Sequence, residues 1–566
     1  MLAEQSLRGT DMLKLQRACL LLGLVLSFAY GASASETTDR VDKLFETWDK
    51  PASPGATLAV MKDGQIVYSR GYGLANLEYG VRNSAETVFH VASLSKQFTA
   101  FAIHLLVLEG RISLDDDIRK YVPEMKTQSA IKIRHLLHHT SGLRDQWSLL
   151  TLAGLRLDDV ITESDILGLL FDQRDLNFLP GEEELYSNSG YTLLALIVQR
   201  VAGQTFARFA EQRIFLPLGM GNTRVQETYG TVMPGRAYSY FKGRAGYSYV
   251  ALSYSNSGAT SVFTTVGDLA RWDRNLQTGQ VGGPAVSKAM RELDRLNGGG
   301  DNNYASGLVL GRYRGLPTEE HSGADAGYRA ELLRFPEQRL TVAILANASD
   351  VGAPTLAYRI ADIYLEGTPG LASVAIGPTP IDLNVPGSAP YLGDYQLRPG
   401  FLLSFTSEGH QLMVQATGQP KFVMDASADN AFFTRAFVAS VVFDPPGSDG
   451  VTRTATWKQL GQSSPLVRVT REQPADTELR ACTGDFFSDE LHAIYTLSVR
   501  DGALWLRYPR GSLVLTPLTR GVFSAPFPIG TVTVEKNAAG QCEGLAVTTG
   551  RVRNLAFRKI ALGSPR

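Results

Sequence analysis

The order of strand and helix patterns in the first two thirds of the chain is the feature that most limits its fold. Alternating apolar residues predict an early hairpin, with strands at 57–61 and 65–69 around the turn Lys62-Asp63-Gly64. Strand patterns then return only at 307–313, 328–335 and 340–346. The stretch between them shows helical periodicity, as do the two ends, with helices expected at 38–48, 95–108, 188–201 and 354–364. This order predicts an α+β fold with an antiparallel five-stranded sheet flanked by helices.

The last third of the chain has a different composition, and its sequence predicts two similar units. Residues 367–389 are rich in Gly, Pro and Ser and predict a linker. Tyr391-Leu392-Gly393-Asp394-Tyr395 then resembles Cys482-Thr483-Gly484-Asp485-Phe486, and Phe432 corresponds to Phe523. Each unit consists of short alternating strands, which predicts two small, lipocalin-like antiparallel β-barrels. Chance similarity between two β domains is the alternative. The expected organisation is a signal peptide at 1–34, a catalytic domain at 36–366, the linker at 367–389 and barrels at 390–472 and 478–562.

The N-terminus carries the pattern of an export signal. Arg8, Lys14 and Arg17 precede an apolar run at 18–30 that is too short to span a bilayer, and Ala32-Ser33-Ala34 offers a cleavage point. A retained membrane anchor is the alternative. We expect an exported, periplasmic or secreted protein with no stable membrane span after cleavage. Export permits a disulfide between Cys482 and Cys542, and two unpaired buried thiols are the alternative.

Charge and composition restrict the class of partner. The 55 basic and 56 acidic residues give a formal net charge of −1, so the chain has no basic field for nucleic acid. The expected partner is a small-molecule or short-peptide substrate, while the sequence leaves the oligomeric state open. His135, His138 and His139 lack a metal-binding spacing, and no cofactor is expected.

The segment Ser93-Leu94-Ser95-Lys96 carries the strongest chemical signal. At the start of a helix, two residues three apart lie on one face, so Lys96 can reach the hydroxyl of Ser93. A serine becomes nucleophilic when a base takes its proton, and burial can lower the pKa of a lysine enough to provide that base. Ser129-Ala130-Ile131-Lys132 has the same spacing, but no long apolar helix follows it directly. Helix context therefore favours Ser93 as the nucleophile.

Two further motifs supply groups that an acyl-transfer site needs. Tyr186-Ser187-Asn188 offers a phenol to relay a proton and an amide to orient a substrate carbonyl. Tyr254-Ser255-Asn256 repeats this motif, but its flanking residues favour a structural loop. His321-Ser322-Gly323 precedes a predicted strand, where Gly323 permits close approach and the Ala324 N–H could be the second oxyanion donor beside that of Ser93.

Together the three motifs resemble the serine β-lactamase and penicillin-binding protein superfamily, in particular its class C branch. The stretches at 136–142, 215–220 and 265–272 also look like that branch, and the resemblance covers about 41–365. It implies that Ser93 is acylated, that Lys96 and Tyr186 carry protons, and that Asn188 and His321 position the substrate. Which of Lys96 and Tyr186 is the general base stays open.

One departure from the family pattern bears on the substrate. His321 stands where β-lactamases usually carry a lysine, and a neutral histidine should bind a carboxylate more weakly. The resemblance therefore favours esterases and D-aminopeptidases, and a catalytic domain followed by two barrels resembles the three-domain D-aminopeptidases. In that group a barrel loop reaches the active site, although the sequence does not reveal which loop it is here. The alternatives are a carboxylesterase, a weak β-lactamase or DD-peptidase, and a non-catalytic protein that binds peptides or peptidoglycan.

Overall fold

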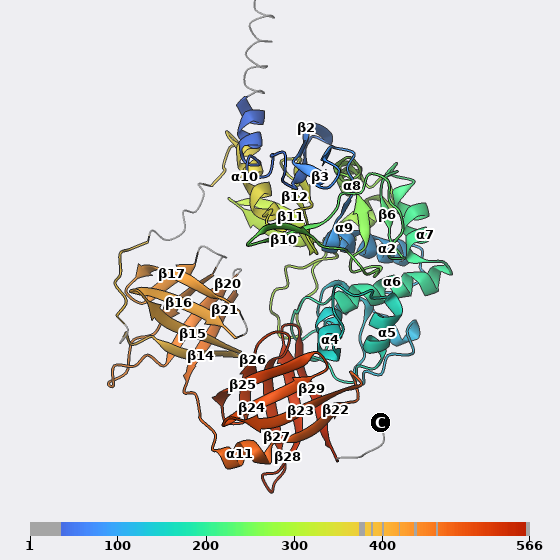
Figure 1. The fold of residues 1–566 in the computed structure, drawn as a ribbon. Helices are drawn as coiled ribbons and strands as arrows, with labels where there is room; N and C mark the ends of the chain where they lie inside the picture. The colour runs from blue at the N-terminus through green and yellow to red at the C-terminus, as the bar shows by residue number, and fades with distance from the viewer. Residues whose placement is uncertain are drawn as a thin grey trace, which may run out of the picture.

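The computed structural model describes residues 36–372, 380–386, 389–398, 401–417, 419–434, 439–459 and 462–561. The predicted signal peptide at 1–34 lies outside these residues. A mixed α/β body holds the N-terminal two thirds of the chain, and two β-barrels follow it (Figure 1). Within the described part, no helix has the length and apolar character needed to cross a membrane.

The central sheet of the α/β body is antiparallel and joins the two ends of this region, as the sequence predicts. It has six strands rather than the five expected. The additional strand, β11, carries His321. Its many polar residues interrupt the apolar alternation that would predict a strand. In sheet order the strands are β10 (Val309–Tyr313), β11 (Leu316–Asp325), β12 (Tyr328–Phe335), β13 (Leu340–Ala346), β1 (Ala56–Lys62) and β2 (Gln65–Tyr72).

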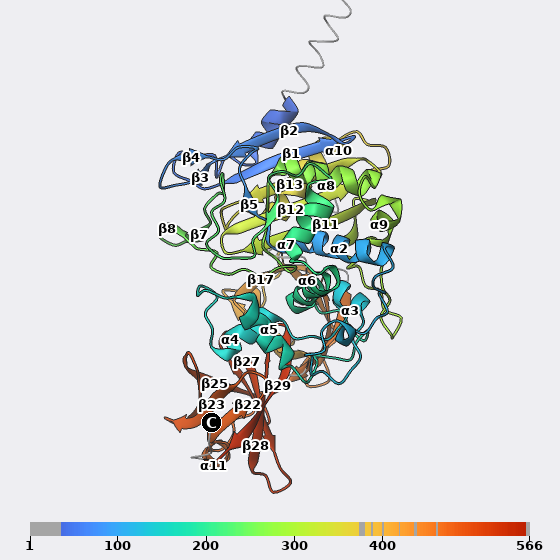
Figure 2. The ribbon, with the colours of Figure 1, turned by 90° about the vertical axis from the view of Figure 1, so that its right-hand side faces the viewer.

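Helices cover both faces of this sheet, so its middle strands are buried on both sides (Figure 2). One face packs against the last helix of the body and against the helical residues 36–43. The other face packs against the nucleophile-bearing segment and the long helices of the body. The named helices of the body, on either face, are α2 (Lys96–Leu108), α3 (Ile133–Leu137), α4 (Gln146–Ala153), α5 (Glu163–Phe171), α6 (Asn188–Ala202), α7 (Phe206–Ala210), α8 (Val266–Thr278), α9 (Gly283–Ala289) and α10 (Ala353–Leu365).

Short elements complete the α/β body. Two 3-10 turns and a π-helical turn connect the helices, and three small sheets pair as β3-β4, β5-β9-β6 and β7-β8. The turns are η1 (Ala92–Ser95), η2 (Ile118–Lys120) and η3 (Glu211–Phe215); the strands are β3 (Leu74–Asn76), β4 (Val81–Arg82), β5 (Phe89–His90), β6 (Arg224–Val225), β7 (Tyr240–Gly243), β8 (Gly246–Tyr249) and β9 (Val262–Thr264).

The C-terminal third forms two closed eight-stranded antiparallel barrels, as the sequence predicts. The first barrel contains β14 (Gly393–Arg398), β15 (Phe401–Glu408), β16 (Gln411–Ala416), β17 (Lys421–Ala428), β18 (Ala431–Thr434), β19 (Ala439–Phe443), β20 (Thr454–Gln459) and β21 (Gln462–Val469). Helix α11 (Asp476–Ala481) leads into the second barrel, which contains β22 (Gly484–Ser488), β23 (Ala493–Arg500), β24 (Ala503–Tyr508), β25 (Gly511–Thr519), β26 (Val522–Ala525), β27 (Gly530–Lys536), β28 (Cys542–Thr549) and β29 (Val552–Ile560).

The predicted repeat pairs occupy equivalent places in the two barrels. Gly393 and Gly484 each open the first strand with a positive φ, at 141° and 135°. Phe432 and Phe523 are both buried in the fifth strand. The barrels differ in how they meet the α/β body. The first has a core of its own, whereas the core of the second is continuous with that of the body, and Tyr495 donates a hydrogen bond to the Leu152 carbonyl in α4.

Candidate active site

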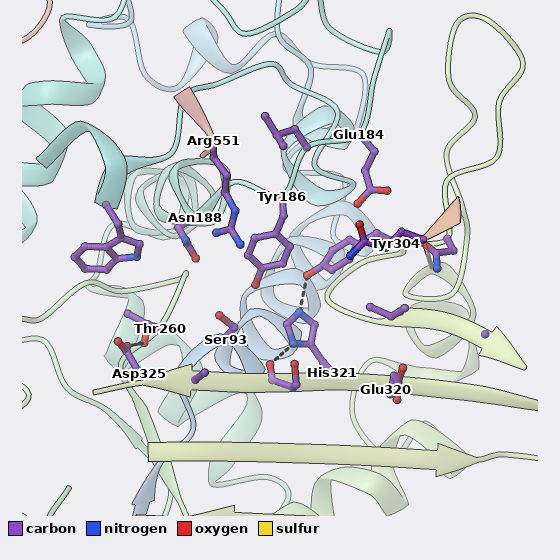
Figure 3. Close-up of a pocket in the computed structure, with 18 of the residues that line it drawn as sticks. Ser93, Glu184, Tyr186, Asn188, Thr260, Tyr304, Glu320, His321, Asp325 and Arg551 are labelled. Atoms are coloured by element: carbon purple, nitrogen blue, oxygen red, sulfur yellow. Dashed lines mark hydrogen bonds between the residues drawn. The ribbon is translucent and has the colours of Figure 1, made fainter. Parts of the chain in front are cut away.

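Ser93 lies in η1, the turn between strand β5 and helix α2, and its side chain lines a cavity of about 1320 Å³ (Figure 3). Ala92, just before it, has a left-handed φ of 49°. Such a conformation costs a non-glycine residue free energy and occurs where the surrounding structure holds it. The turn thereby presents Ser93 to the cavity at the N-terminus of a long buried helix.

Lys96 is fully buried and its Nζ atom has three partners. It lies 3.2 Å from Ser93 Oγ, 2.8 Å from Asn188 Oδ1 and 2.8 Å from the Ala259 carbonyl oxygen. Burial, reinforced by the positive charge of Arg551, lowers the pKa of Lys96 to about 7. A neutral amine keeps two N–H donors, which the two carbonyl oxygens accept. Its lone pair is then left for the hydroxyl proton of Ser93.

Tyr186 lies above Ser93 with its hydroxyl pointing toward that residue (Figure 3). The phenol oxygen is buried and has no hydrogen-bond partner among the described residues. Burial raises the pKa of Tyr186, although the Ser93 hydroxyl and the Arg551 charge oppose part of this rise. Two basic side chains approach the ring: Lys96 Nζ is 4.9 Å and the Arg551 guanidinium carbon 4.8 Å from its centre. The phenol is therefore protonated at neutral pH and suited to donate a proton.

Asn188 is the first residue of α6 and is held by a carboxylate that the sequence analysis missed. Asp145 Oδ2 accepts hydrogen bonds from the backbone N–H of Asn188 at 2.9 Å and from its Nδ2 at 2.8 Å. Its Oδ1 accepts one from the Trp147 N–H at 3.1 Å, so Asp145 also caps α4. An Asp before an apolar run does signal a helix cap, but nothing in the sequence links it to Asn188.

His321 lies on β11 and is buried beside the cavity. Its Nδ1 is 2.7 Å from the Ser322 carbonyl oxygen, an acceptor, so this nitrogen carries the proton. Its Nε2 then accepts a hydrogen bond from the Tyr304 hydroxyl at 2.8 Å. Burial, together with the charge of Lys96, lowers the pKa of His321 to about 3, so the imidazole is neutral. The cation that a lysine would bring to this position is absent, as the sequence implies.

Gly323 and Ala324 lie where β11 passes the nucleophile-bearing turn. A β-carbon on Gly323 would be 2.1 Å from the carbonyl oxygen of Val91, so this strand position accepts only glycine at the observed separation. Ala324 lines the cavity together with Ser93. All seven predicted site residues therefore line this cavity or lie directly beside residues that line it.

The competing motifs have other environments. Lys132 forms a surface ion pair with Asp115 at 3.0 Å, and neither it nor Ser129 lines the cavity. Tyr254 does line the cavity, so the second Tyr-Ser-Asn motif is more than a distant loop. Its Asn256 Oδ1 accepts hydrogen bonds from Gln146 Nε2 and Thr192 Oγ1, which is a structural network within the core.

The predicted histidine group also packs around the site. The His139 ring lies 4.1 Å from that of Tyr186, and its Nδ1 accepts a hydrogen bond from the Ser187 N–H. His138 Nδ1 contacts the Tyr304 carbonyl oxygen at 3.0 Å. In the described part of the chain, no group of three or more His, Cys, Asp or Glu residues is arranged to hold a metal ion.

Both barrels contribute to the cavity wall, whereas the family resemblance implied a loop from one barrel. The first barrel contributes Leu397, Trp457, Gln459 and Ser464, and the turn between β28 and β29 of the second barrel contributes Arg551. Only the tertiary structure brings a residue near the C-terminus beside Ser93.

Comparison with known proteins agrees with this geometry. Residues 41–365, more than half of the chain, match the Beta-lactamase family. The chain belongs to the Beta-lactamase family. Penicillin-binding protein 4* of Bacillus subtilis (strain 168) is 30% identical over 430 residues, which cover 71% of this chain and 92% of that protein. A D-aminopeptidase of Brucella anthropi is 25% identical over 523 residues, 90% of this chain and 95% of that protein.

Solved structures share the fold of this Beta-lactamase family member. The octameric penicillin-binding protein homologue from Pyrococcus abyssi has a TM-score of 0.53 at 19% identity, covering 86% of this chain and 99% of that one. A D-amino acid amidase from Ochrobactrum anthropi SV3 has a TM-score of 0.50 at 22% identity, covering 58% and 98%. At these identities the likeness concerns the fold.

Proposed function

We propose that this protein is a serine hydrolase that cleaves amide bonds of D-amino acid amides or short peptides through an acyl-Ser93 intermediate. The observation that carries the proposal is the buried Lys96, which contacts Ser93 and has a pKa of about 7. A lysine that loses its proton near neutral pH can act as a general base at the pH where most enzymes work. The match to a D-aminopeptidase over 90% of the chain, barrels included, supports the amide substrate.

In the proposed acylation, neutral Lys96 takes the hydroxyl proton as Ser93 Oγ attacks the substrate carbonyl carbon. The backbone N–H groups of Ser93 and Ala324 would hold the negative charge that develops on the carbonyl oxygen. The C–N bond then breaks, and the leaving amine takes a proton from Tyr186, which Lys96 can replace. Water hydrolyses the Ser93 ester by the same route, releasing the acid and restoring the hydroxyl.

The pKa values support a division of roles between the two proton carriers. Burial raises the pKa of Tyr186 and lowers that of Lys96, so at neutral pH the phenol holds its proton while the amine readily gives its proton up. We therefore propose Lys96 as the general base for acylation and Tyr186 as the donor to the leaving group. Asn188, fixed by Asp145, would orient the substrate carbonyl.

Labelling with a fluorophosphonate probe tests the nucleophile. We expect one adduct, mapped by peptide mass spectrometry to Ser93, and none in Ser93→Ala. Ser129→Ala is the matched control because it alters the second Ser-x-x-Lys motif and should label like the parent. An adduct on another residue, or unchanged labelling of Ser93→Ala, would contradict the proposal.

A substrate panel tests the bond that is cleaved. D- and L-amino acid amides, short acyl esters and a chromogenic cephalosporin separate the amidase from a carboxylesterase or a β-lactamase. We expect hydrolysis of D-amides and slow turnover of the cephalosporin, because neutral His321 offers no cation for its carboxylate. Binding of peptidoglycan without any turnover or labelling would instead indicate a non-catalytic binding protein.

A further inference from the structure

Arg551 reaches the active site from the second barrel on a firmly docked turn. Its carbonyl oxygen accepts hydrogen bonds from the Asp145 N–H at 3.2 Å and from Asn177 Nδ2 at 3.0 Å. The Arg553 N–H donates to Asn177 Oδ1 at 2.7 Å. Nearby, a buried ion pair joins Arg144 to Glu490 of the barrel at 2.6 Å. The turn is therefore part of the site wall, and the position of Arg551 is fixed by contacts of its backbone.

The guanidinium of Arg551 is held in place but keeps donors free. It stacks at 4.8 Å on the Tyr186 ring, and its side chain is 43% exposed to the cavity and solvent. Its nearest acid is Asp145, whose Oδ2 is 3.8 Å from Nη1 and already accepts two hydrogen bonds from Asn188. Among the described residues, the guanidinium donates no hydrogen bond. A planar, permanently charged fork with unused N–H groups is suited to bind a carboxylate.

The other charged groups around the cavity make Arg551 distinctive. Of the described lining residues, Arg312 is the second arginine, and it donates to the Gly315 carbonyl oxygen. The carboxyl groups of Asp158, Glu184, Glu320 and Asp325 also line the cavity. Because His321 is neutral, Arg551 is, among the described lining residues, the permanent cation beside Ser93 and Asn188.

The side of the cavity on which Arg551 lies indicates which part of a substrate it would meet. Figure 3 shows Arg551 and Asn188 on one side of the Tyr186 ring, and Tyr304, Glu184 and His321 on the other. In the proposed reaction Tyr186 gives its proton to the leaving amine, and Asn188 orients the part of the substrate that stays on Ser93. A group bound by Arg551 on the Asn188 side therefore belongs to the acyl part.

We propose that Arg551 binds a carboxylate on the acyl side of the scissile bond, so that the preferred substrates are amides of acidic amino acids. This inference rests on the proposed function for the reaction and specifies that the acyl part of the substrate carries a negative charge. The cationic side chain would come from the second barrel rather than from the α/β body, which makes the barrel a direct contributor to specificity.

A pair of substrates that differ only in charge tests the inference. The p-nitroanilides of D-glutamic acid and D-glutamine have nearly the same shape. The ratio of their kcat/KM values at pH 8.5 therefore measures how much the side-chain carboxylate favours the reaction. We expect the parent enzyme to favour the acidic member by about tenfold to a hundredfold, as for a charge-assisted hydrogen bond. Arg551→Gln should bring the ratio close to one, and Arg551→Lys should retain part of it.

Arg312→Gln tests whether the effect is specific to the position of Arg551. It removes the other arginine of the cavity wall and should keep the parent ratio of kcat/KM values. Circular dichroism checks that each variant is folded. Because both substrates share the catalytic steps, a change in the proton affinity of Lys96 affects them equally and leaves the ratio unchanged. A parent ratio near one, or an equal loss on both substrates in Arg551→Gln, would overturn the inference.

A binding measurement keeps this test separate from that of the proposed function. D-glutamate and D-glutamine are compared for their ability to slow fluorophosphonate labelling of Ser93. Stronger protection by D-glutamate in the parent, lost in Arg551→Gln, supports the carboxylate subsite even if no D-amide is hydrolysed. Equal protection by the two ligands, or protection by neither, counts against it.

Discussion

A β-carbon on Gly323 would lie 2.1 Å from the Val91 carbonyl oxygen, so β11 and the turn that carries Ser93 touch through their backbones. Both oxyanion donors proposed for the site depend on this contact, because Ala324 follows Gly323 and Ser93 lies two residues after Val91. The contact couples a packing constraint to catalysis.

Gly323→Ala should therefore impair both stability and activity. The added methyl group meets backbone rather than a movable side chain, so we expect a loss of about 1–3 kcal/mol in the free energy of unfolding, measured by urea denaturation. We expect kcat to fall more than KM rises, because the oxyanion donors move apart. Gly168→Ala is the control, since nothing lies within 4 Å of its β-carbon. Normal kcat in folded Gly323→Ala would contradict the role of this contact.

The pH dependence of kcat/KM should follow Lys96. The neutral amine is the active form, so activity should rise with pH through a pKa of about 7. His321, with a pKa of about 3, adds no titration above pH 5. Lys96→Ala should lower kcat by about 10²- to 10⁴-fold, as expected for loss of a general base. A profile that is flat between pH 5.5 and 8.5 would exclude Lys96 as the base.

Arg551→Gln should shift this acid limb to higher pH. The positive charge of Arg551 helps to lower the pKa of Lys96, so its removal lets the amine hold its proton more tightly. Arg551→Lys keeps the charge and should leave the limb close to its parental position. The measurement is kcat/KM for a neutral substrate from pH 5.5 to 9. A shift to lower pH in Arg551→Gln is inconsistent with the electrostatic coupling.

Asp145→Asn tests the support of Asn188. Loss of a charged acceptor for the Asn188 amide should lower the free energy of unfolding by about 1.5–3 kcal/mol and also lower kcat. Asp117→Asn is the matched control, because Asp117 caps η2 by accepting the Arg119 N–H and does not line the cavity. It should lower stability with little effect on kcat. If both variants keep parental kcat, Asp145 only caps a helix.

The two cysteines should react slowly in the folded protein. Cys482 and Cys542 are free and buried in the structure, and burial, with their mutual contact, raises the pKa of the Cys542 thiol to about 12. We expect negligible alkylation by iodoacetamide at pH 8 and full alkylation after unfolding. Peptide mass spectrometry without reductant decides whether the two cysteines form a disulfide, which would block alkylation in both states.

Local patterns determined much of the fold and pointed to most of the groups proposed for catalysis. Helix periodicity after Ser93 distinguished it from Ser129, and the order of strand patterns predicted a sheet joining both ends of the α/β body. These signals are readable because they lie within a few residues of each other. Strand β11 was not predicted because polar residues interrupt its apolar alternation. The predicted sheet therefore had one strand too few.

Tertiary structure alone decided how the site is charged. Asp145 supports Asn188, Tyr304 fixes the proton position on His321, and Arg551 stacks on Tyr186, yet no spacing in the sequence relates these residues. The sequence indicated a neutral His321 and hence a weak carboxylate site, whereas folding places the Arg551 cation beside Ser93. The physical reason is that charge and burial act through space, so the pKa of Lys96 depends on its burial and on the charge of Arg551, which the second barrel supplies.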